Sequence, residues 1–295
     1  MVVLLCTQDF KMAFDSNIFG EPPEWKSRSL GPDPTKETIE DFNNLFSEYV
    51  SSKRVAIVGP ASSLDGLGLG KKIDDYDVVV RVNLRQPLSP EMISDFGSRS
   101  DVLLYNMNAT CCVALHNHKS WLNKAEWRIL SDLRSVEYSA GYLRKYHPAM
   151  YDLMKETEAS EKQGFHMLGA DYTKTMMRNI GTVANAGLMY VLWLLQYDVK
   201  ELFICGMSFY NMGEWGDCYN ESLHKGEYYN NYSSRTQPAG FLTKEQGHHN
   251  ARGDIHDQEK QITYFAKLLE IYYNNPITLD PYLTKAFEVE KSSKE

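Results

Sequence analysis

The sequence predicts an α/β fold in which a mainly parallel sheet is flanked by helices within a single domain. Four short apolar runs lead to this prediction: Arg54–Gly59, Tyr76–Asn83, Asp101–Asn106 and Glu201–Gly206. Continuous apolar runs of this length are typical of strands that are buried on both faces of a parallel sheet. Helix-length connections separate the first three runs, which indicates βαβ units.

The domain organisation follows from where these runs begin and end. A chain of 295 residues is within the size that one core can organise. We expect an N-terminal extension and helix over residues 1–52, the main domain over residues 53–280 and a C-terminal tail over residues 281–295. The extension contains several prolines up to Pro34 and ends in an amphipathic helix that reaches about Ser52.

Helices are predicted for much of the remaining main domain. The segment Ser120–Gln163 is expected to be mostly helical, and Ala184–Tyr197 is apolar almost all round, which indicates a buried helix. A long polar segment, Asn211–Asp254, is rich in Gly, Asn and Tyr, as binding loops and lids often are. An amphipathic helix follows His256.

The charge balance and the cysteines narrow the possible functions. The chain has 39 acidic and 31 basic residues, a net charge of -8, and shows no basic patch, so nucleic acid is not an expected partner. The five cysteines form no CxxC pair, which predicts reduced thiols. The apolar start, Met1–Cys6, is too short for a signal peptide or a transmembrane segment. We therefore expect a soluble cytoplasmic protein, located in the Golgi only if an N-terminal anchor has been removed.

Four glycines lie between the first predicted strand and the helix after it: Gly59, Gly66, Gly68 and Gly70. A Walker loop requires Ser or Thr after Gly-Lys, but Lys72 stands there. A dinucleotide fold requires an acid at the end of the second strand, but that strand ends at Asn83. Neither fingerprint is complete, and a tight structural turn explains the glycines equally well.

No metal site is expected. Asp75 and Asp77 match the Asp-x-Asp pattern that holds a divalent metal in many sugar-transferring enzymes, but they precede the second strand. Ligands of open α/β sheets bind at the carboxyl ends of strands, so we assign these acids to a helix end and a turn. The histidines near the end of the polar segment, His248, His249 and His256, fit no common zinc spacing.

His256 is the best candidate for a general base. It stands at the start of a predicted helix, directly after the long polar segment, and its pKa lies near neutrality in the absence of perturbation. A helix cap or a surface histidine is the simpler alternative, because position by itself does not establish catalysis.

Three blocks, in order, resemble a known family. The stretches Val55–Gly59, Leu64–Gly70, Ile73–Asn83 and Asp95–Arg99 resemble the large sialylmotif of glycosyltransferase family 29. Gly181–Gly206 is similar to the small sialylmotif, and Gly253–Asp257 resembles the very small motif that carries the catalytic histidine of this family. Gly206–Tyr210 is also similar to the bacterial sialyltransferases of family 42.

The resemblance implies a Rossmann-like domain of the GT-A-variant type and an inverting, metal-independent glycosyltransferase. Its donor would be CMP-sialic acid or a related CMP-sugar of Kdn or Kdo, its acceptor a glycan or glycolipid, and it would need no cofactor. His256 would be the base, and His248 or His249, with Tyr228 or Tyr229, would stabilise the departing phosphate. The residues that would bind the nucleotide sugar are Gly59, Ser62, Ser63, Asn83, Asn185, Ala186, Gly187, Gly206, Tyr228 and Tyr229.

Several positions depart from the motifs. Pro60 and Ser63 replace asparagines in the first turn, and Asn185-Ala186 replaces Ser-Thr before Gly187. The acid expected five residues after His256 is Gln261, with Glu259 as a possible substitute. Lys53 and Arg54 stand where animal members have a cysteine. The changes in the first turn, before Gly187 and at Gln261 support an alternative function, a catalytically inactive nucleotide-binding or interaction module.

Overall fold

The computed structural model describes the chain in eight segments. They are residues 44–82, 90–106, 125–131, 165–168, 176–182, 184–209, 257–272 and 276–287.

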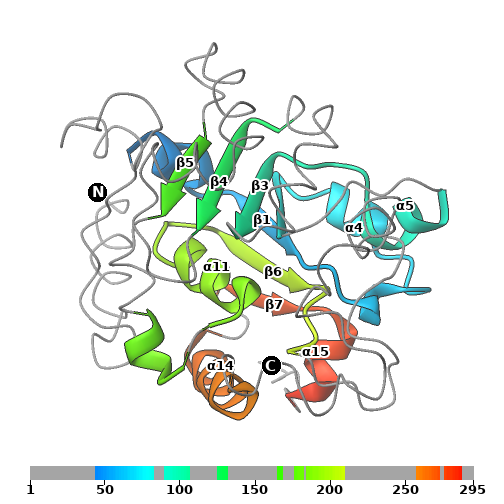
Figure 1. Ribbon diagram of the computed structural model, residues 1–295. Helices are drawn as coiled ribbons and strands as arrows, with labels where there is room; N and C mark the ends of the chain where they lie inside the picture. The colour runs from blue at the N-terminus through cyan, green and yellow to red at the C-terminus, as the bar shows by residue number, and fades with distance from the viewer. Residues whose placement is uncertain are drawn as a thin grey trace, which may run out of the picture.

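A parallel sheet of seven strands forms the centre of the molecule (Figure 1). The strand order is β5-β4-β3-β2-β1-β6-β7, and every neighbouring pair is parallel. The strands are β1 (Arg54–Val58), β2 (Val78–Val82), β3 (Val102–Asn106), β4 (Trp127–Ser131), β5 (Phe165–Leu168), β6 (Glu201–Cys205) and β7 (Ile277–Leu279).

The predicted fold class is confirmed in its coarse form: a parallel sheet with flanking helices. All four apolar runs form strands, β1, β2, β3 and β6. The prediction that residues 120–163 are mostly helical is wrong at β4, where Arg128 interrupts the apolar pattern although its side chain is buried. The three-residue strand β7 was also not predicted.

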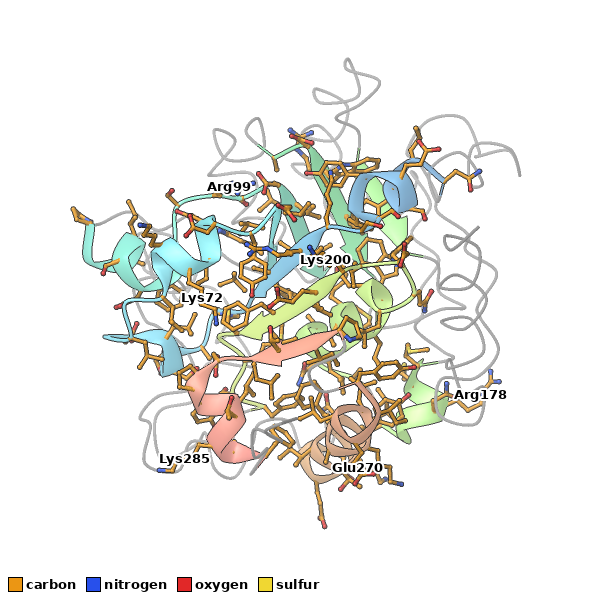
Figure 2. The ribbon with its side chains drawn as sticks, turned by 180° about the vertical axis from the view of Figure 1, so that it is seen from behind. Lys72, Arg99, Arg178, Lys200, Glu270 and Lys285 are labelled. Atoms are coloured by element: carbon orange, nitrogen blue, oxygen red, sulfur yellow. The ribbon has the colours of Figure 1, made fainter. Side chains whose placement is uncertain are left out.

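Alternate residues of the strands contribute to two cores, one on each face of the sheet. In β1, Val55 and Ile57 pack in the core that includes α11 (Ala186–Leu194), α14 (Gln258–Tyr272) and the helix over residues 44–50. Ala56 and Val58 pack in the core on the opposite face. That face carries the 3-10 helix η1 (Ser62–Leu64), α4 (Gly70–Asp74) and α5 (Pro90–Phe96). Figure 2 shows this second face, with Lys72 of α4 close to the end of β6; its ammonium lies 4.0 Å from the ring centroid of Phe203.

The buried helix predicted for residues 184–197 is confirmed as α11. Its residues 188–194 are fully buried, which explains why the sequence is apolar all round. The amphipathic helix predicted after His256 is also confirmed as α14, with Phe265 and Leu269 buried and Glu270 exposed. Glu270 points outward from α14 in Figure 2.

The folded part extends beyond the predicted boundary at residue 280. Pro281–Ala286 form helix α15, and Tyr282 and Leu283 are buried in the core. Asp280 caps this helix, since its Oδ1 accepts a hydrogen bond of 2.7 Å from the backbone N–H of Leu283. A capping Asp followed by Pro at the first helical position is a common start of a helix, so these residues are not a tail.

The carboxyl ends of β1 and β6 meet where the chain direction reverses across the sheet. From β1 the strands run to β5 on one side, and β6 and β7 lie on the other. Gly59 follows β1, Gly206 follows β6, and a Cβ on Gly206 would lie 2.5 Å from the carbonyl oxygen of Gly59. Ligands of open α/β sheets bind at such a switch point.

We predict that Gly59→Ala is strongly destabilising. A Cβ at this position would overlap the carbonyl oxygen of Gly206 and lie 2.9 Å from Cγ of Met207. Overpacking of this kind costs about 3 kcal/mol of unfolding free energy. Gly68→Ala is the control, because Gly68 has a φ of 62° with nothing within 4 Å and should lose only about 1 kcal/mol from strain. Equal losses for the two variants in urea unfolding would contradict the close approach.

A second prediction concerns Asp280, whose Oδ2 accepts a hydrogen bond of 2.8 Å from the N–H of Gly206. Burial raises the pKa of Asp280 to about 6, above its ordinary value, so the folded protein holds a proton that the unfolded chain releases. The stability that this proton contributes is present below about pH 4 and is lost as the pH rises through about 6.

Relative to Asp280→Asn, the wild-type protein should therefore lose about 3 kcal/mol of unfolding free energy between pH 4 and pH 7. Urea unfolding at several pH values measures this difference. Asp198→Asn, which removes an exposed carboxylate, controls for the loss of one charge. A difference between wild type and Asp280→Asn that stays constant with pH would disprove the assignment.

Candidate functional site

The turn after β1 contains three of the candidate nucleotide-binding residues, Gly59, Ser62 and Ser63. The N–H of Gly59 donates to the carbonyl of Cys205 at 2.8 Å, so the turn starts in contact with the end of β6. Ser62 and Ser63 begin the 3-10 helix η1. Ser63 is 5% exposed, and its Oγ has no hydrogen-bond partner in the described structure. A buried hydroxyl without a partner at a switch point is available to a bound ligand.

Met207 joins this turn to the start of α11. A Cβ on Gly59 would lie 2.9 Å from Cγ of Met207, and a Cβ on Gly187 would lie 3.0 Å from its Sδ. The side chain of Met207 therefore lies between the two glycines. The structure thus brings together the candidates Gly59, Gly187 and Gly206, which come from three different segments of the chain.

The start of α11 has backbone N–H groups that lack an acceptor within the helix. Asn185 caps the helix, and its Oδ1 accepts a hydrogen bond of 2.8 Å from the N–H of Leu188. Ala186 and Gly187 are the first two residues of the helix, where N–H groups have no intrahelical acceptor. Together with the positive end of the helix dipole, these groups form a region that favours an anion.

Three contacts hold the start of α14 against the segment before α11. The backbone N–H of Asp257 donates to Oγ1 of Thr182 at 3.0 Å, and Nζ of Lys260 donates to the carbonyl of Gly181 at 3.3 Å. The backbone N–H of Asn185 donates to Oε1 of Gln261 at 2.7 Å. These contacts bring the start of α14, which follows the stretch that resembles the very small motif, next to residues of the stretch that resembles the small motif.

Asp257 is the cap of α14. Its Oδ1 accepts a hydrogen bond of 3.1 Å from the backbone N–H of Lys260, and its Oδ2 lies 3.4 Å from Nζ of the same residue. The backbone hydrogen bond from Lys260 is the main reason why the pKa of Asp257 is lowered. Glu259, considered above as a substitute for the expected acid, is exposed, whereas Gln261 is buried and makes the contact with α11.

The glycine-rich segment is a structural turn. Gly66 and Gly68 have positive φ angles, and their N–H groups donate to the two carboxylate oxygens of Asp95 at 2.7 and 2.8 Å. Asp74 similarly accepts hydrogen bonds from the backbone of Ser98 and Arg99. Because Asp95 already accepts hydrogen bonds from these N–H groups, Gly66 and Gly68 form a structural turn and not a phosphate-binding loop.

Asp75 and Asp77 have the structural positions that were expected. Asp75 is the C-cap of α4. Oδ2 of Asp77 accepts a hydrogen bond of 2.8 Å from the N–H of Arg54 at the amino end of β1. Both acids therefore lie at the sheet edge opposite the carboxyl ends of β1 and β6. Among the residues that the structure describes, no group of three or more His, Cys, Asp or Glu could hold a metal ion.

Six of the candidate residues lie outside the described residues. They are Asn83, Tyr228, Tyr229, His248, His249 and His256. Of the five cysteines, Cys205 is described: it is free and buried. No helix in the described segments is long and apolar enough to cross a membrane.

Sequence reasoning missed two residues that shape this site. Met207 was overlooked because a methionine after a strand carries no chemical signal, although it directly follows the candidate Gly206. Asp280 was assigned to the domain boundary, yet its Oδ2 holds the N–H of Gly206. The Asp-Pro pair at 280–281 was the available signal, since it is typical of a helix start.

The comparisons with known proteins agree with the resemblance. The sequence profile of glycosyltransferase family 29 (sialyltransferase) matches residues 24–176, more than half of the chain. A search of curated proteins gave no match.

Two similar solved structures are crystal structures of a mammalian sialyltransferase, one in complex with Gal-beta-1-3GalNAc-ortho-nitrophenol. They share 13% and 14% sequence identity with this chain, with TM-scores of 0.46 and 0.45. Each alignment covers 92% of this chain and 85% of the other. On the extent of the profile match, the chain belongs to glycosyltransferase family 29, the sialyltransferases, and is a CMP-sugar glycosyltransferase.

Proposed function

We propose that this enzyme transfers a nonulosonic acid, namely sialic acid, Kdn or Kdo, from its CMP donor to a hydroxyl of a glycan or glycolipid. In this proposal the domain is a Rossmann-like variant of the GT-A type, and the reaction inverts the anomeric configuration without a metal ion. The set of contacts between the start of α14 and the start of α11 is the observation that carries it, since they join an anion-binding helix end to the segment after His256.

The nucleotide-binding part of the proposal rests on the switch point at the carboxyl ends of β1 and β6. The CMP moiety would lie over the turn Gly59–Ser63, next to Gly206. Asn83, which follows the last residue of β2 in the sequence, would also contact it. The unpartnered hydroxyl of Ser63 supplies a buried polar contact there. The carboxylate of the sugar would then accept hydrogen bonds from the N–H groups of Ala186 and Gly187.

The proposed chemistry is a single displacement. His256 takes the proton from the acceptor hydroxyl as its oxygen attacks the anomeric carbon, and the bond from that carbon to the phosphate oxygen breaks with both electrons leaving on CMP. Asp257, the next residue in the chain, donates its backbone N–H to Oγ1 of Thr182, which precedes α11. His248 or His249, with Tyr228 or Tyr229, would stabilise the charge on the departing phosphate.

Metal independence is proposed because the two acids of the Asp-x-Asp pattern lie away from the carboxyl ends of β1 and β6. Asp77 binds the backbone of Arg54, and Asp75 ends α4, both at the amino edge of the sheet.

A cytoplasmic location remains part of the same proposal and is compatible with the free thiol of Cys205.

His256→Ala should reduce the release of CMP from CMP-sialic acid in the presence of an acceptor panel by about 10²- to 10⁴-fold, because a positioned base contributes that much. Its affinity for CMP, measured by calorimetry, should stay within about twofold, since the nucleotide contacts are made at the switch point. His147→Ala, outside the three motif blocks, is the control. Turnover equal to that of the wild type would remove His256 from the mechanism.

Transfer should persist after dialysis against EDTA, and added Mg²⁺ or Mn²⁺ should change the rate by less than about twofold, because no step of the proposed reaction uses a cation. The measurement is CMP release before chelation, after chelation and after metal is returned. Loss of activity in EDTA with recovery on metal addition would contradict metal independence.

If the untreated wild-type enzyme binds CMP but transfers no sugar to any acceptor, the alternative of an inactive nucleotide-binding module is correct.

A further inference from the structure

The carboxyl group of Asp280 lies between two backbone donors. Its Oδ2 accepts a hydrogen bond of 2.8 Å from the N–H of Gly206, and its Oδ1 accepts one of 2.7 Å from the N–H of Leu283. The backbone N–H of Asp280 donates to the carbonyl of Ile204 at 3.1 Å. The residue is 0% exposed. Its carboxyl group therefore links the end of β6 to the start of α15, which directly follows β7 (Figure 1).

The same peptide group binds Asp280 on one side and the turn after β1 on the other. The N–H of Gly206 and the carbonyl of Cys205 belong to one planar peptide unit. That carbonyl accepts the N–H of Gly59 at 2.8 Å, and the carbonyl of Gly206 accepts the N–H of Ala61 at 2.8 Å. Asp280 thus holds the peptide group on which the turn after β1 is docked.

Two further contacts join α15 to the segment after Gly206. Oη of Tyr282 donates to the carbonyl of Ser208 at 3.4 Å, and the ring of Phe287 meets the ring of Phe209 edge-on with 5.8 Å between centroids. Phe209 has a φ of 50°, which is unfavourable for a residue with a large side chain. Such a conformation persists only where neighbouring contacts hold it. The segment Gly206–Phe209 is therefore held in place from the side of α15.

At neutral pH the carboxyl group of Asp280 costs folding free energy. Burial raises its pKa to about 6, so its ionised form is disfavoured in the folded protein. Cys205 on β6 and Lys72 on α4 are the titratable groups that act on it, β7 consists of uncharged residues, and on α15 Tyr282 is buried and Lys285 exposed. Stability therefore does not explain this carboxylate, and such a cost is typical of groups that serve a site.

We propose that Asp280 is a positioning residue for the nucleotide: its carboxylate fixes the peptide group between Cys205 and Gly206, and with it the turn Gly59–Ser63, in the geometry that binds CMP. The inference rests on the proposed function, because CMP is taken to lie over this turn. It makes α15 a part of the donor site, although this helix follows the last of the three motif blocks.

The main test is Asp280→Asn at pH 8. An amide has one acceptor oxygen, and its Nδ2 is a donor that would face one of the two N–H groups. The Kd of CMP, measured by calorimetry, should therefore rise by about tenfold or more. KM for CMP-sialic acid should rise by the same factor, and kcat should change by less than about threefold, because the contact is lost equally in the ground state and the transition state. The midpoint of urea unfolding should not fall, since the variant lacks the buried charge.

The pH dependence gives an independent readout. At pH 5 most of the wild-type carboxyl groups carry a proton, and a protonated carboxyl group, like the amide, has a donor in place of one acceptor. The ratio of the two CMP Kd values, Asp280→Asn to wild type, should fall from about tenfold at pH 8 towards one at pH 5. The titration of CMP itself affects both measurements equally and cancels in this ratio.

Two further variants separate the hydrogen bond to Gly206 from other effects. Asp280→Ser keeps a hydroxyl that can cap α15 but has no second oxygen for Gly206, so it should bind CMP about as weakly as Asp280→Asn at pH 8. Leu195→Ala removes a buried side chain at the other end of α11. This control should lower the midpoint of urea unfolding and leave the Kd of CMP within about twofold.

The outcomes distinguish this inference from the proposed function. If the wild-type enzyme binds neither CMP nor CMP-sialic acid, the proposed function fails, and the role of Asp280 fails with it. If the wild type binds CMP and Asp280→Asn binds it equally tightly at pH 8, the role of Asp280 is overturned while the proposed function stands. A loss of affinity that comes with a lower urea midpoint, or that is the same at pH 5 and pH 8, would also overturn it, because it would indicate a general loosening of the fold.

Discussion

The site depends on the close approach of two backbone turns at the ends of β1 and β6. The N–H of Gly59 reaches the carbonyl of Cys205, and the N–H of Ala61 reaches the carbonyl of Gly206, both at 2.8 Å. No side chain fits between the turns, which explains the need for glycine at both positions. The buried carboxyl of Asp280 holds the N–H of Gly206 from the neighbouring strand, so β7 and α15 contribute to the same constraint. The switch point is therefore built from groups that are already bonded, and a ligand meets a prearranged surface.

Much of the sheet could be predicted because its central strands are buried on both faces and consist largely of apolar residues; in β2 only Arg81 interrupts the run. This holds for β1 and β6, which pair along their whole length. It fails for β4, where the apolar pattern is broken by Arg128, whose burial lowers its pKa to about 10. It also fails for β7 and α15, because three residues are too few to show a period and Asp280 resembles an ordinary surface acid in the sequence. Short elements whose polar residues are satisfied by tertiary contacts are not visible in local patterns.

The separate elements of the site could be predicted from the sequence, but the contacts between them could not. The start of α11 follows from a helical apolar run and the capping residue Asn185, both of which are local signals. The contacts that bring α14 to this helix join residues 75, 76 and 79 positions apart in the chain. The local sequence around Gln261 does not predict that its amide accepts a hydrogen bond from the backbone of Asn185. The packing of Met207 between Gly59 and Gly187 could not be predicted either, because only the sheet topology brings those segments together.

The acids of the large motif and the residues proposed for chemistry have different tasks. Asp74 and Asp95 of this motif, and Asp101 just after it, accept hydrogen bonds from backbone N–H groups and so hold the framework on the face of α4 and α5. The profile match that establishes the family, over residues 24–176, covers this framework. The start of α11 and the start of α14 lie beyond it. The framework is held by hydrogen bonds from backbone N–H groups to carboxylates, whereas the start of α11 is held by the side-chain amide of Gln261. In the proposed reaction, the contacts between α11 and α14 would position the acidic sugar, and the turns after β1 and β6 would hold the nucleotide.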